Sequence, residues 1–318
     1  MKRIAILVSG GDAPGVNAAI EAAARWLAAH HAEAWGVRGG FAGLLAGKLE
    51  PLTPSAVAGI GARGGVLFGT SRERVLGEPD APERLHRVWA DNRLDGLLVL
   101  GGDGTIRQAT KIVYEWGYPL IALPCTIDND VPLTERSLGH DSASNRALPL
   151  IDAIRDTASA LPGRLFVVET LGGSTGHLAI AVAFAAQADA VAVPEIKADA
   201  VAVGRKLAAA VEQRGYGLAV ACEGIGRMAD FCDAVAAAAG YRVRLTALGH
   251  TQRGGPPSAA DRELARVWAE LGAAELLAGA GGQMLAWQAG AIGTVPLPDV
   301  FAAPPKAINR QWYEQINE

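Results

Sequence analysis

Residues 98–105 read LVLGGDGT, an apolar run that passes through paired glycines and an aspartate toward a helical pattern. Two other stretches have this form, LVSGGDAPG at residues 7–15 and VETLGGSTG at residues 168–176. In each, a strand is followed by Gly-Gly and then by a helix. Continuous apolar strands separated by helices are typical of parallel sheets that are covered on both faces. The sequence therefore predicts an α/β protein.

The same alternation continues along the 318 residues, half of which are hydrophobic, so the chain is long enough for two cores. We predict strands at residues 3–9, 34–37, 96–100, 120–123, 165–169, 190–193, 218–222 and 243–245. Helical patterns occupy residues 16–30, 106–116, 143–160, 175–187, 198–214, 228–239 and 259–278. We expect two doubly wound, Rossmann-like lobes with parallel central sheets and an active site in the cleft between them. The first comprises residues 1–138 and about 251–303, the second residues 139–250 and about 304–318.

Composition excludes several classes of protein. The net charge is −4 and no block of basic residues occurs, so we expect neither nucleic acid nor an anionic membrane surface as a partner. The apolar stretch at residues 4–8 is too short for a signal sequence or a membrane span. Cys125, Cys222 and Cys232 are too few and too scattered for a disulfide framework or a zinc site. We therefore expect a cytoplasmic enzyme.

The glycine-rich loops point to phosphate. Paired glycines allow positive φ and close backbone approach, and the helix that follows offers free N–H groups and a positive dipole end. Asp103, inside such a loop, is placed to hold Mg²⁺. A single Gly-Gly-Asp would as readily be a tight turn with an aspartate cap. Three copies after strands favour one extended anionic ligand, or two ligands facing each other.

Residues 124–130, PCTIDND, place two acids and an amide after a strand. One carboxylate could accept a proton from a sugar hydroxyl while the other binds metal or orients the first. An ordinary Asx turn is the alternative.

Residues 248–255, LGHTQRGG, hold His250 and Arg253 among three glycines, which suits a phosphate clasp; a solvated turn is the alternative. Arg72 is a candidate for charge neutralisation, or a plain surface arginine. Glu223, at a strand end, is a candidate for binding sugar hydroxyls, or a helix-capping acid.

Together these motifs resemble the bacterial type of the 6-phosphofructokinase family. The resemblance covers nearly the whole chain in the family's order and spacing. Its most specific pieces are SGGDAPGVNA at residues 9–18, GGDG at 101–104, TIDND at 126–130 and LGHTQRGG at 248–255. It implies ATP- and Mg²⁺-dependent phosphoryl transfer to the 1-hydroxyl of fructose 6-phosphate, giving fructose 1,6-bisphosphate in glycolysis. It also implies a homotetramer, with a dimer as the least functional unit.

The resemblance also implies roles for single residues. Asp128 is the base for the sugar hydroxyl, supported by Asp130, while Thr126 and Arg72 act on the transferring phosphoryl group. The nucleotide cradle comprises Gly11, Arg72, Gly102, Asp103, Gly104 and Thr105, with Asp103 as the Mg²⁺ ligand. The sugar phosphate is bound by Thr126, Asp128, Leu171, Gly172, Gly173, Glu223, His250 and Arg253, together with Arg164 and Arg244 from a neighbouring subunit.

The donor depends on a few positions. Relatives that use ATP have Gly at the position of Gly104, whereas those that use pyrophosphate have Asp there and Lys at the position of Cys125. Gly104 favours ATP, although Cys125 matches neither group and Gln108 replaces a glycine beside the adenine. Phe41 stands where a tyrosine commonly flanks the nucleotide. ATP is the expected donor, with another nucleoside triphosphate or pyrophosphate as alternatives.

The acceptor depends on Gly173, which replaces an arginine of the family's sugar-binding loop. Either the chain phosphorylates another sugar phosphate, such as sedoheptulose 7-phosphate, or it is a weakly active or non-catalytic paralogue that binds sugar phosphate. The complete set of Asp103, Asp128 and Asp130 favours a working kinase. An NAD-binding dehydrogenase is excluded because no clean Gly-x-Gly-x-x-Gly follows the first strand.

The family's effector site is incomplete. Arg25 and Arg155 match its basic cluster, but Glu21 and Pro54 replace two arginines, and residues 213–217 lack a basic run. Because a polyanion needs several cations, we predict weak or absent control by ADP or phosphoenolpyruvate.

Overall fold

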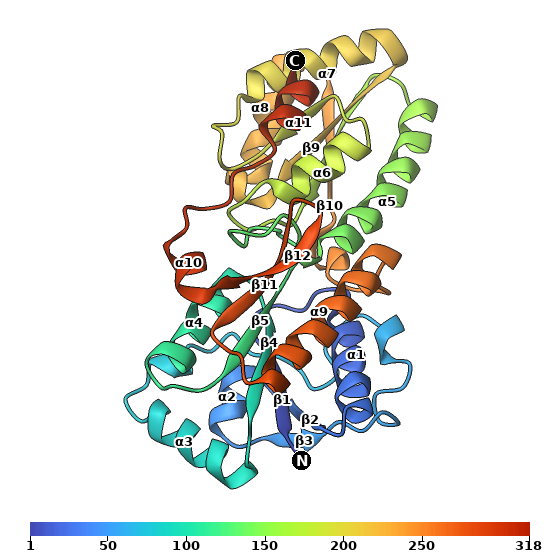
Figure 1. Cartoon of the computed structure of the whole chain (residues 1–318). Helices are drawn as coiled ribbons and strands as arrows, with labels where there is room; N and C mark the ends of the chain where they lie inside the picture. Colours follow the sequence, from blue (N-terminus) through green and yellow to red (C-terminus); the bar gives the residue numbers. More distant parts are fainter. The chain divides into compact units, whose positions relative to one another are not determined.

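A computed structural model describes every residue from Met1 to Glu318 (Figure 1). The chain forms two compact units. Unit 1 comprises Met1–Asp141 and Arg253–Lys306, and unit 2 comprises Ser142–Gln252 and Ala307–Glu318. Each unit has its own sheet of mainly parallel strands, so the predicted α/β class is confirmed. None of the helices combines the length and apolar character needed to cross a lipid bilayer.

Unit 1 is built on an eight-stranded sheet. The strands are β1 (Arg3–Val8), β2 (Glu33–Val37), β3 (Leu49–Pro51), β4 (Gly96–Gly101), β5 (Leu120–Thr126), β6 (Leu138–Gly139), β11 (Gln283–Gln288) and β12 (Ala291–Pro296). Their order is β12-β11-β5-β4-β1-β2-β3, with β6 pairing β5 beside this path. The central strands are parallel, and the edge strands β3 and β12 are antiparallel. None of β3, β6, β11 and β12 was predicted from the sequence. β3 and β6 are very short, and β12 lacks a continuous apolar run. β11 has an apolar run of only four residues, 284–287.

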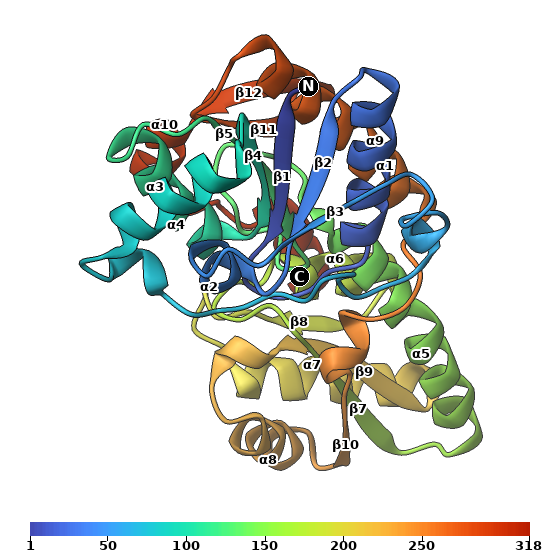
Figure 2. The same cartoon turned by 90° about the horizontal axis from the view of Figure 1, so that it is seen from below.

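Alternate side chains of the parallel strands point to opposite faces of the sheet. The helices of unit 1 are α1 (Val16–Ala29), α2 (Gly40–Leu45), α3 (Ala81–Asn92), α4 (Asp103–Tyr114), α9 (Ala259–Ala278) and α10 (Leu297–Ala302). Leu7, Val99 and Ala122 share one buried cluster with residues of α2, α3, α4 and α10. The opposite face is packed by α9, where a methyl group on Gly272 would come within 2.8 Å of Leu98. Figure 2 shows α1 and α9 on one side of this sheet and α2, α3 and α4 on the other.

Unit 2 has a four-stranded parallel sheet of order β10-β7-β9-β8. Its strands are β7 (Arg164–Thr170), β8 (Ala190–Ala192), β9 (Tyr216–Cys222) and β10 (Arg242–Ala247), and its helices are α5 (His140–Ala160), α6 (His177–Ala185), α7 (Ala200–Arg214), α8 (Met228–Ala239) and α11 (Arg310–Asn317). Leu165 and Val167 of β7 pack with Leu207 of α7 and Val235 of α8. On α6 and α11, the rings of Phe184 and Trp312 stack at 4.4 Å.

The sheet of unit 1 brings three loops to one edge. β1, β4 and β5 are neighbours in parallel register, with Val8 opposite Leu100 and Gly101 opposite Pro124. The loops at their carboxyl ends therefore lie together, which is where open α/β sheets bind ligands. One expectation is corrected here. Only the loop after β4 enters a helix directly, whereas α1 and α6 begin several residues beyond their Gly-Gly pairs.

Candidate active site

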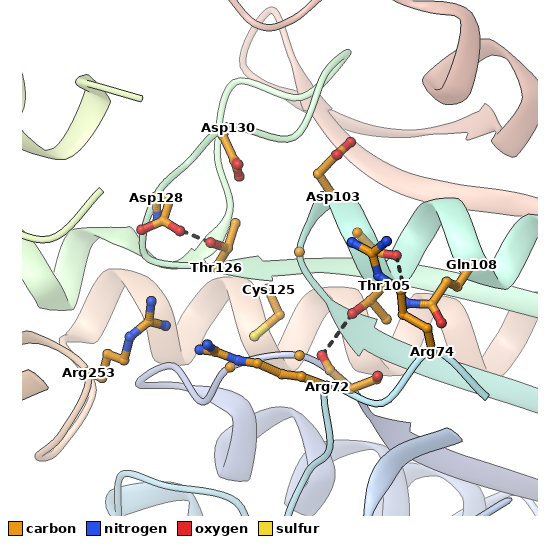
Figure 3. A pocket seen from close by; sticks show the side chains of 15 residues that line it. Arg72, Arg74, Asp103, Thr105, Gln108, Cys125, Thr126, Asp128, Asp130 and Arg253 are labelled. Carbon is orange, nitrogen blue, oxygen red and sulfur yellow. Dashed lines mark hydrogen bonds between the residues drawn. The ribbon is translucent and has the colours of Figure 1, made fainter. Parts of the chain in front are cut away.

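Every site residue predicted within unit 1 lines one cavity of about 330 Å³ at this edge of the sheet (Figure 3). These residues are Gly11, Arg72, Gly102, Asp103, Gly104, Thr105, Thr126, Asp128, Asp130 and Arg253. The cavity is completed by Ser9, Gly10, Arg74, Gln108 and Cys125. The remaining predicted residues belong to unit 2 and are described separately.

The first two glycine-rich loops are tied together. Thr105 Oγ1 donates a hydrogen bond of 3.0 Å to the carbonyl of Ser9, which joins the loop after β4 to the loop after β1. Around Gly104 the space is open, because no atom lies within 4 Å of the position that a Cβ would take. The backbone of this loop is therefore accessible to a ligand.

Asp103 is the first residue of α4, and it is held by Arg107 one turn later. Arg107 Nε lies 2.9 and 2.7 Å from the two carboxylate oxygens of Asp103, and its Nη1 donates to the carbonyl of Phe301 at 3.3 Å. No cluster of three or more acidic, histidine or cysteine ligands for a metal exists in the structure. Mg²⁺ commonly uses one or two carboxylates, several waters and substrate phosphates. Asp103 therefore fits a magnesium ion that is bound together with a phosphate ligand.

Asp128 and Asp130 project into the same cavity from the loop after β5. The backbone N–H of Asp128 donates to Thr126 Oγ1 at 3.1 Å. Asp130 has a buried Oδ1 without a hydrogen-bond partner. Burial, followed by the neighbouring charge of Asp128, raises the pKa of Asp130 to about 6. A carboxyl that titrates near neutral pH in a cavity is typical of a catalytic site.

Two guanidinium groups converge on Gly11. A methyl group on Gly11 would lie 2.7 Å from Arg253 Nη1 and 3.1 Å from Arg72 Nη2. Neither arginine forms an ion pair within unit 1. In Figure 3 they lie on the side of the pocket opposite Asp103 and Asp130. Two adjacent cations without a carboxylate partner make a site for an anion such as a phosphoryl group.

Arg74 also lines the cavity, although no sequence motif pointed to it. Arg74 lies two residues beyond Arg72. In an extended segment alternate side chains share one face, so this spacing could have indicated that Arg74 points the same way as Arg72.

Three positions that bear on the donor have different surroundings. The buried Cys125 thiol lines the cavity, and burial raises its pKa, so it remains protonated. The amide of Gln108 donates to the carbonyl of Gly104 at 3.3 Å and also lines the cavity. Phe41 is fully buried among the core residues of unit 1. The ring of Phe41 therefore fills the core and does not line the cavity.

In unit 2, Glu223 is joined to the predicted sugar-binding loop. Gly173 N–H donates to Glu223 Oε1 at 3.0 Å, and Leu171 N–H donates to Gln252 Oε1 at 2.8 Å. Gly172 and Gly173 have φ values of 149° and 59°, which glycine adopts most readily. The side chain of His250, in the same unit, is exposed. Glu223 and Gln252 thus each hold one backbone N–H of the loop of residues 171–173.

Arg164 and Arg244 lie on neighbouring strands of unit 2. Arg242 pairs with Arg164 and Arg244 with Phe166, so these side chains share one face of the sheet. Strand β10 is the sheet edge, and Arg244 is exposed.

The positions of the family's effector site are engaged within the chain. Glu21 accepts hydrogen bonds from the N–H groups of Gly59 (3.1 Å) and Gly61 (2.8 Å) and pairs with Arg25 at 2.8 Å. In unit 2, Arg155 donates to the carbonyls of Ala186 and Gln187. Neither arginine is free to serve an anionic effector without breaking these contacts.

Comparison with known proteins identifies the family of this chain. A family model described as Phosphofructokinase matches residues 3–275. The chain is 39% identical over 314 residues to the ATP-dependent 6-phosphofructokinase 1 of Thermus thermophilus, covering 98% of this chain and 97% of that protein. It is 37% identical over 267 residues to the ATP-dependent 6-phosphofructokinase of Brevibacillus brevis, covering 83% of each.

Solved structures show the same architecture. Pichia pastoris phosphofructokinase in the T-state matches with a TM-score of 0.87 at 28% identity over 95% of this chain, which spans 35% of that longer protein. A pyrophosphate-dependent phosphofructokinase from Marinobacter aquaeolei matches in fold, with a TM-score of 0.83 at 22% identity, covering 99% of this chain and 91% of that one. The chain belongs to the phosphofructokinase family. It is a phosphotransferase of the 6-phosphofructokinase type.

Proposed function

We propose that this chain transfers the terminal phosphoryl group of ATP to the 1-hydroxyl of fructose 6-phosphate, giving fructose 1,6-bisphosphate in the cytoplasm. The observation that carries the proposal is the shared cavity of Asp103, Asp128, Arg72 and Arg253. A base, a metal-ligating carboxylate and two cations around one space are the parts that phosphoryl transfer requires.

The residues have distinct roles in this proposal. Asp128 accepts the proton of the attacking hydroxyl, and the adjacent Asp130 keeps the region negative. Arg72 and Thr126 contact the transferring phosphoryl group, and the backbone of Gly11, Gly102, Gly104 and Thr105 cradles the donor phosphates. When Mg²⁺ is bound at Asp103, it supplies charge neutralisation to the donor phosphates. Because no group of the protein is phosphorylated, catalysis depends on positioning and electrostatics.

The sugar phosphate is assigned to residues of unit 2 together with Thr126, Asp128 and Arg253 of unit 1. Glu223 and the loop of Leu171, Gly172 and Gly173 contact the sugar, while His250 and Arg253 contact its 6-phosphate. Arg164 and Arg244 are contributed by a neighbouring subunit of a homotetramer. The exposed edge strand β10, which carries Arg244, supports the participation of a second subunit.

ATP is preferred as the donor for two reasons. The space beside Gly104 is open, and the curated relatives described above are ATP-dependent enzymes. The identity of the sugar phosphate that accepts the phosphoryl group is less constrained, because Gly173 provides no side chain that could contact the sugar.

The test is an assay of ADP or phosphate release with purified protein, ATP and pyrophosphate as donors, and a panel of sugar phosphates that includes sedoheptulose 7-phosphate. We expect the highest kcat/KM with ATP and fructose 6-phosphate. Asp128→Asn should lower kcat by about 10²–10⁴-fold, the usual range for a general base. Asp91→Asn, on an exposed position of α3, is the control. Near-normal turnover by Asp128→Asn, or no transfer to any acceptor by the unmodified enzyme, would refute the proposal.

A further inference from the structure

The loop that carries Asp128 and Asp130 is fastened to the turn between β11 and β12. Glu135 N–H donates to the carbonyl of Trp287 at 2.8 Å, and Trp287 N–H donates to Thr134 Oγ1 at 3.0 Å. Ala289 N–H donates to Glu135 Oε1 at 2.8 Å. A loop that ends a central strand is thereby held by a hairpin at the sheet edge.

One lysine joins this arrangement from the last residue of unit 1. Lys306 Nζ donates to the carbonyl of Glu135 at 3.1 Å, and the same carbonyl accepts from Asn129 Nδ2 at 3.2 Å. Asn129 lies between the two aspartates and has a φ of 51°, a left-handed conformation that needs support from its surroundings. Through this shared acceptor, Lys306 is coupled to the backbone between Asp128 and Asp130.

The charge of Lys306 also acts on Asp130. It is close enough to Asp130 to stabilise the ionised carboxylate, opposing the effects of burial and of the charges of Asp128 and Asp103. Burial lowers the pKa of the half-buried Lys306 amine to about 8, although Asp130 and Glu135 favour its protonated form. His140 is the other titratable group that faces Lys306.

We propose that Lys306 is a positioning residue for the phosphoryl transfer: it braces the loop of residues 127–137 and sets a positive charge beside Asp130. This inference rests on the proposed function, and it adds a residue that none of the sequence motifs contains. Displacement of a catalytic base by about 1 Å can lower the rate of transfer about 10²-fold. A cation beside a crowded group of three carboxylates also keeps them ionised together.

Three substitutions distinguish the effect of the hydrogen bond from Lys306 to Glu135 from the effect of the positive charge of Lys306. Lys306→Met removes both, Lys306→Gln keeps N–H donors without charge, and Lys306→Arg keeps donors and charge. The matched control is Lys206→Met in unit 2, where a half-buried lysine with a lowered pKa donates to the carbonyl of Ile316 at 2.5 Å.

Kinetics with ATP and fructose 6-phosphate test the proposal. We expect Lys306→Met to lower kcat about 10–100-fold with both KM values within about twofold of the unmodified enzyme. Lys306→Arg should restore most of kcat. The alkaline limb of the kcat profile, expected near pH 8, should move beyond pH 10 in Lys306→Arg because arginine remains charged. Lys306→Gln should shift the acidic limb to higher pH because the charge that favours ionised Asp130 is lost.

Amide hydrogen exchange gives a readout that does not require turnover. Residues 127–137 should exchange faster in Lys306→Met and at the original rate in Lys206→Met and Lys306→Arg. Unchanged kcat and exchange in Lys306→Met would overturn the inference, as would an equal loss of kcat in Lys206→Met. If Lys306→Met does not fold, the same comparison is made with Lys306→Leu, which also lacks both the donor and the charge. Absence of transfer by the unmodified enzyme would instead refute the proposed function and leave the exchange test intact.

Discussion

The two arginines at Gly11 allow a prediction that is worked from distances. Gly11 has no positive φ, so its backbone accepts alanine, but the added methyl group would lie 2.7 Å from Arg253 Nη1 and 3.1 Å from Arg72 Nη2. Ordinary contacts begin near 3.4 Å, so Arg253 must withdraw by about 0.7 Å and Arg72 by less. Both groups are the ends of long side chains, so the fold can absorb this movement while the anion site cannot.

We expect Gly11→Ala to lower the catalytic efficiency and to leave the stability of the fold nearly unchanged. A misplacement of about 1 Å costs about 10²-fold, so kcat/KM should fall about 10–100-fold, or about 1.4–2.7 kcal/mol. The free energy of unfolding should change by less than about 1 kcal/mol, because Gly→Ala at a compatible backbone position is near neutral or stabilising.

The assay combines steady-state kinetics with urea unfolding. Gly77→Ala is the matched control, since that glycine has no positive φ and open space around its Cβ position. Gly101→Ala is the contrasting case, because its methyl group would lie 2.5 Å from Thr105 Cβ and should reduce stability. A Gly11→Ala enzyme with unchanged kcat/KM, or one that loses activity only because it unfolds, would show that the guanidinium positions do not control the transfer.

Three further predictions concern titration, the effector region and the donor. Burial raises the pKa of Asp130 from 3.8 to about 6, so its contribution favours the fold below pH 3.8 and is lost as the pH rises through 6. Asp130→Asn should therefore stabilise the protein more at pH 8 than at pH 4.5 in urea unfolding, and equal effects would contradict this. The pKa of Glu21 is lowered: burial acts to raise it, but hydrogen bonds from Gly61 and Gly59 and the charge of Arg25 outweigh burial. The ionised Glu21 carboxylate therefore stabilises the fold above pH 4.5, and this stabilisation is lost in acid. Glu21→Ala should cost about 1–3 kcal/mol at pH 7 and less at pH 3, and the unmodified enzyme should respond weakly to phosphoenolpyruvate; strong inhibition at low concentration would contradict the latter. Gly104→Asp places a carboxylate in open space beside the donor phosphates, so kcat/KM for ATP should fall at least about 10-fold in the donor assay, and retained ATP activity would contradict it.

Residues close together in the chain were predictable because local sequence encodes them. The apolar run of residues 96–100, bounded by Gly101 and Gly102, predicts a buried strand, and the Gly-Gly-Asp of residues 101–103 leads into α4. Loops at the carboxyl ends of neighbouring parallel strands must share an edge, so the common cavity of Gly11, Asp103 and Asp128 follows from topology. By contrast, the burial of Phe41 could not be predicted, because an aromatic side chain in a short helix carries no sign of whether it faces the core or a ligand.

The sequence by itself determined the α/β class, the family and the residues of the glycine-rich and acidic loops, because strand periodicity and loop chemistry are local properties. Only the tertiary structure decided that Arg253 reaches Gly11 and that Lys306 braces the loop of Asp128. These contacts join residues by side chains whose direction depends on packing, and both span more than a hundred residues of chain. Such directions are fixed by the fold as a whole, since each is one of several rotamers that the local sequence allows equally well.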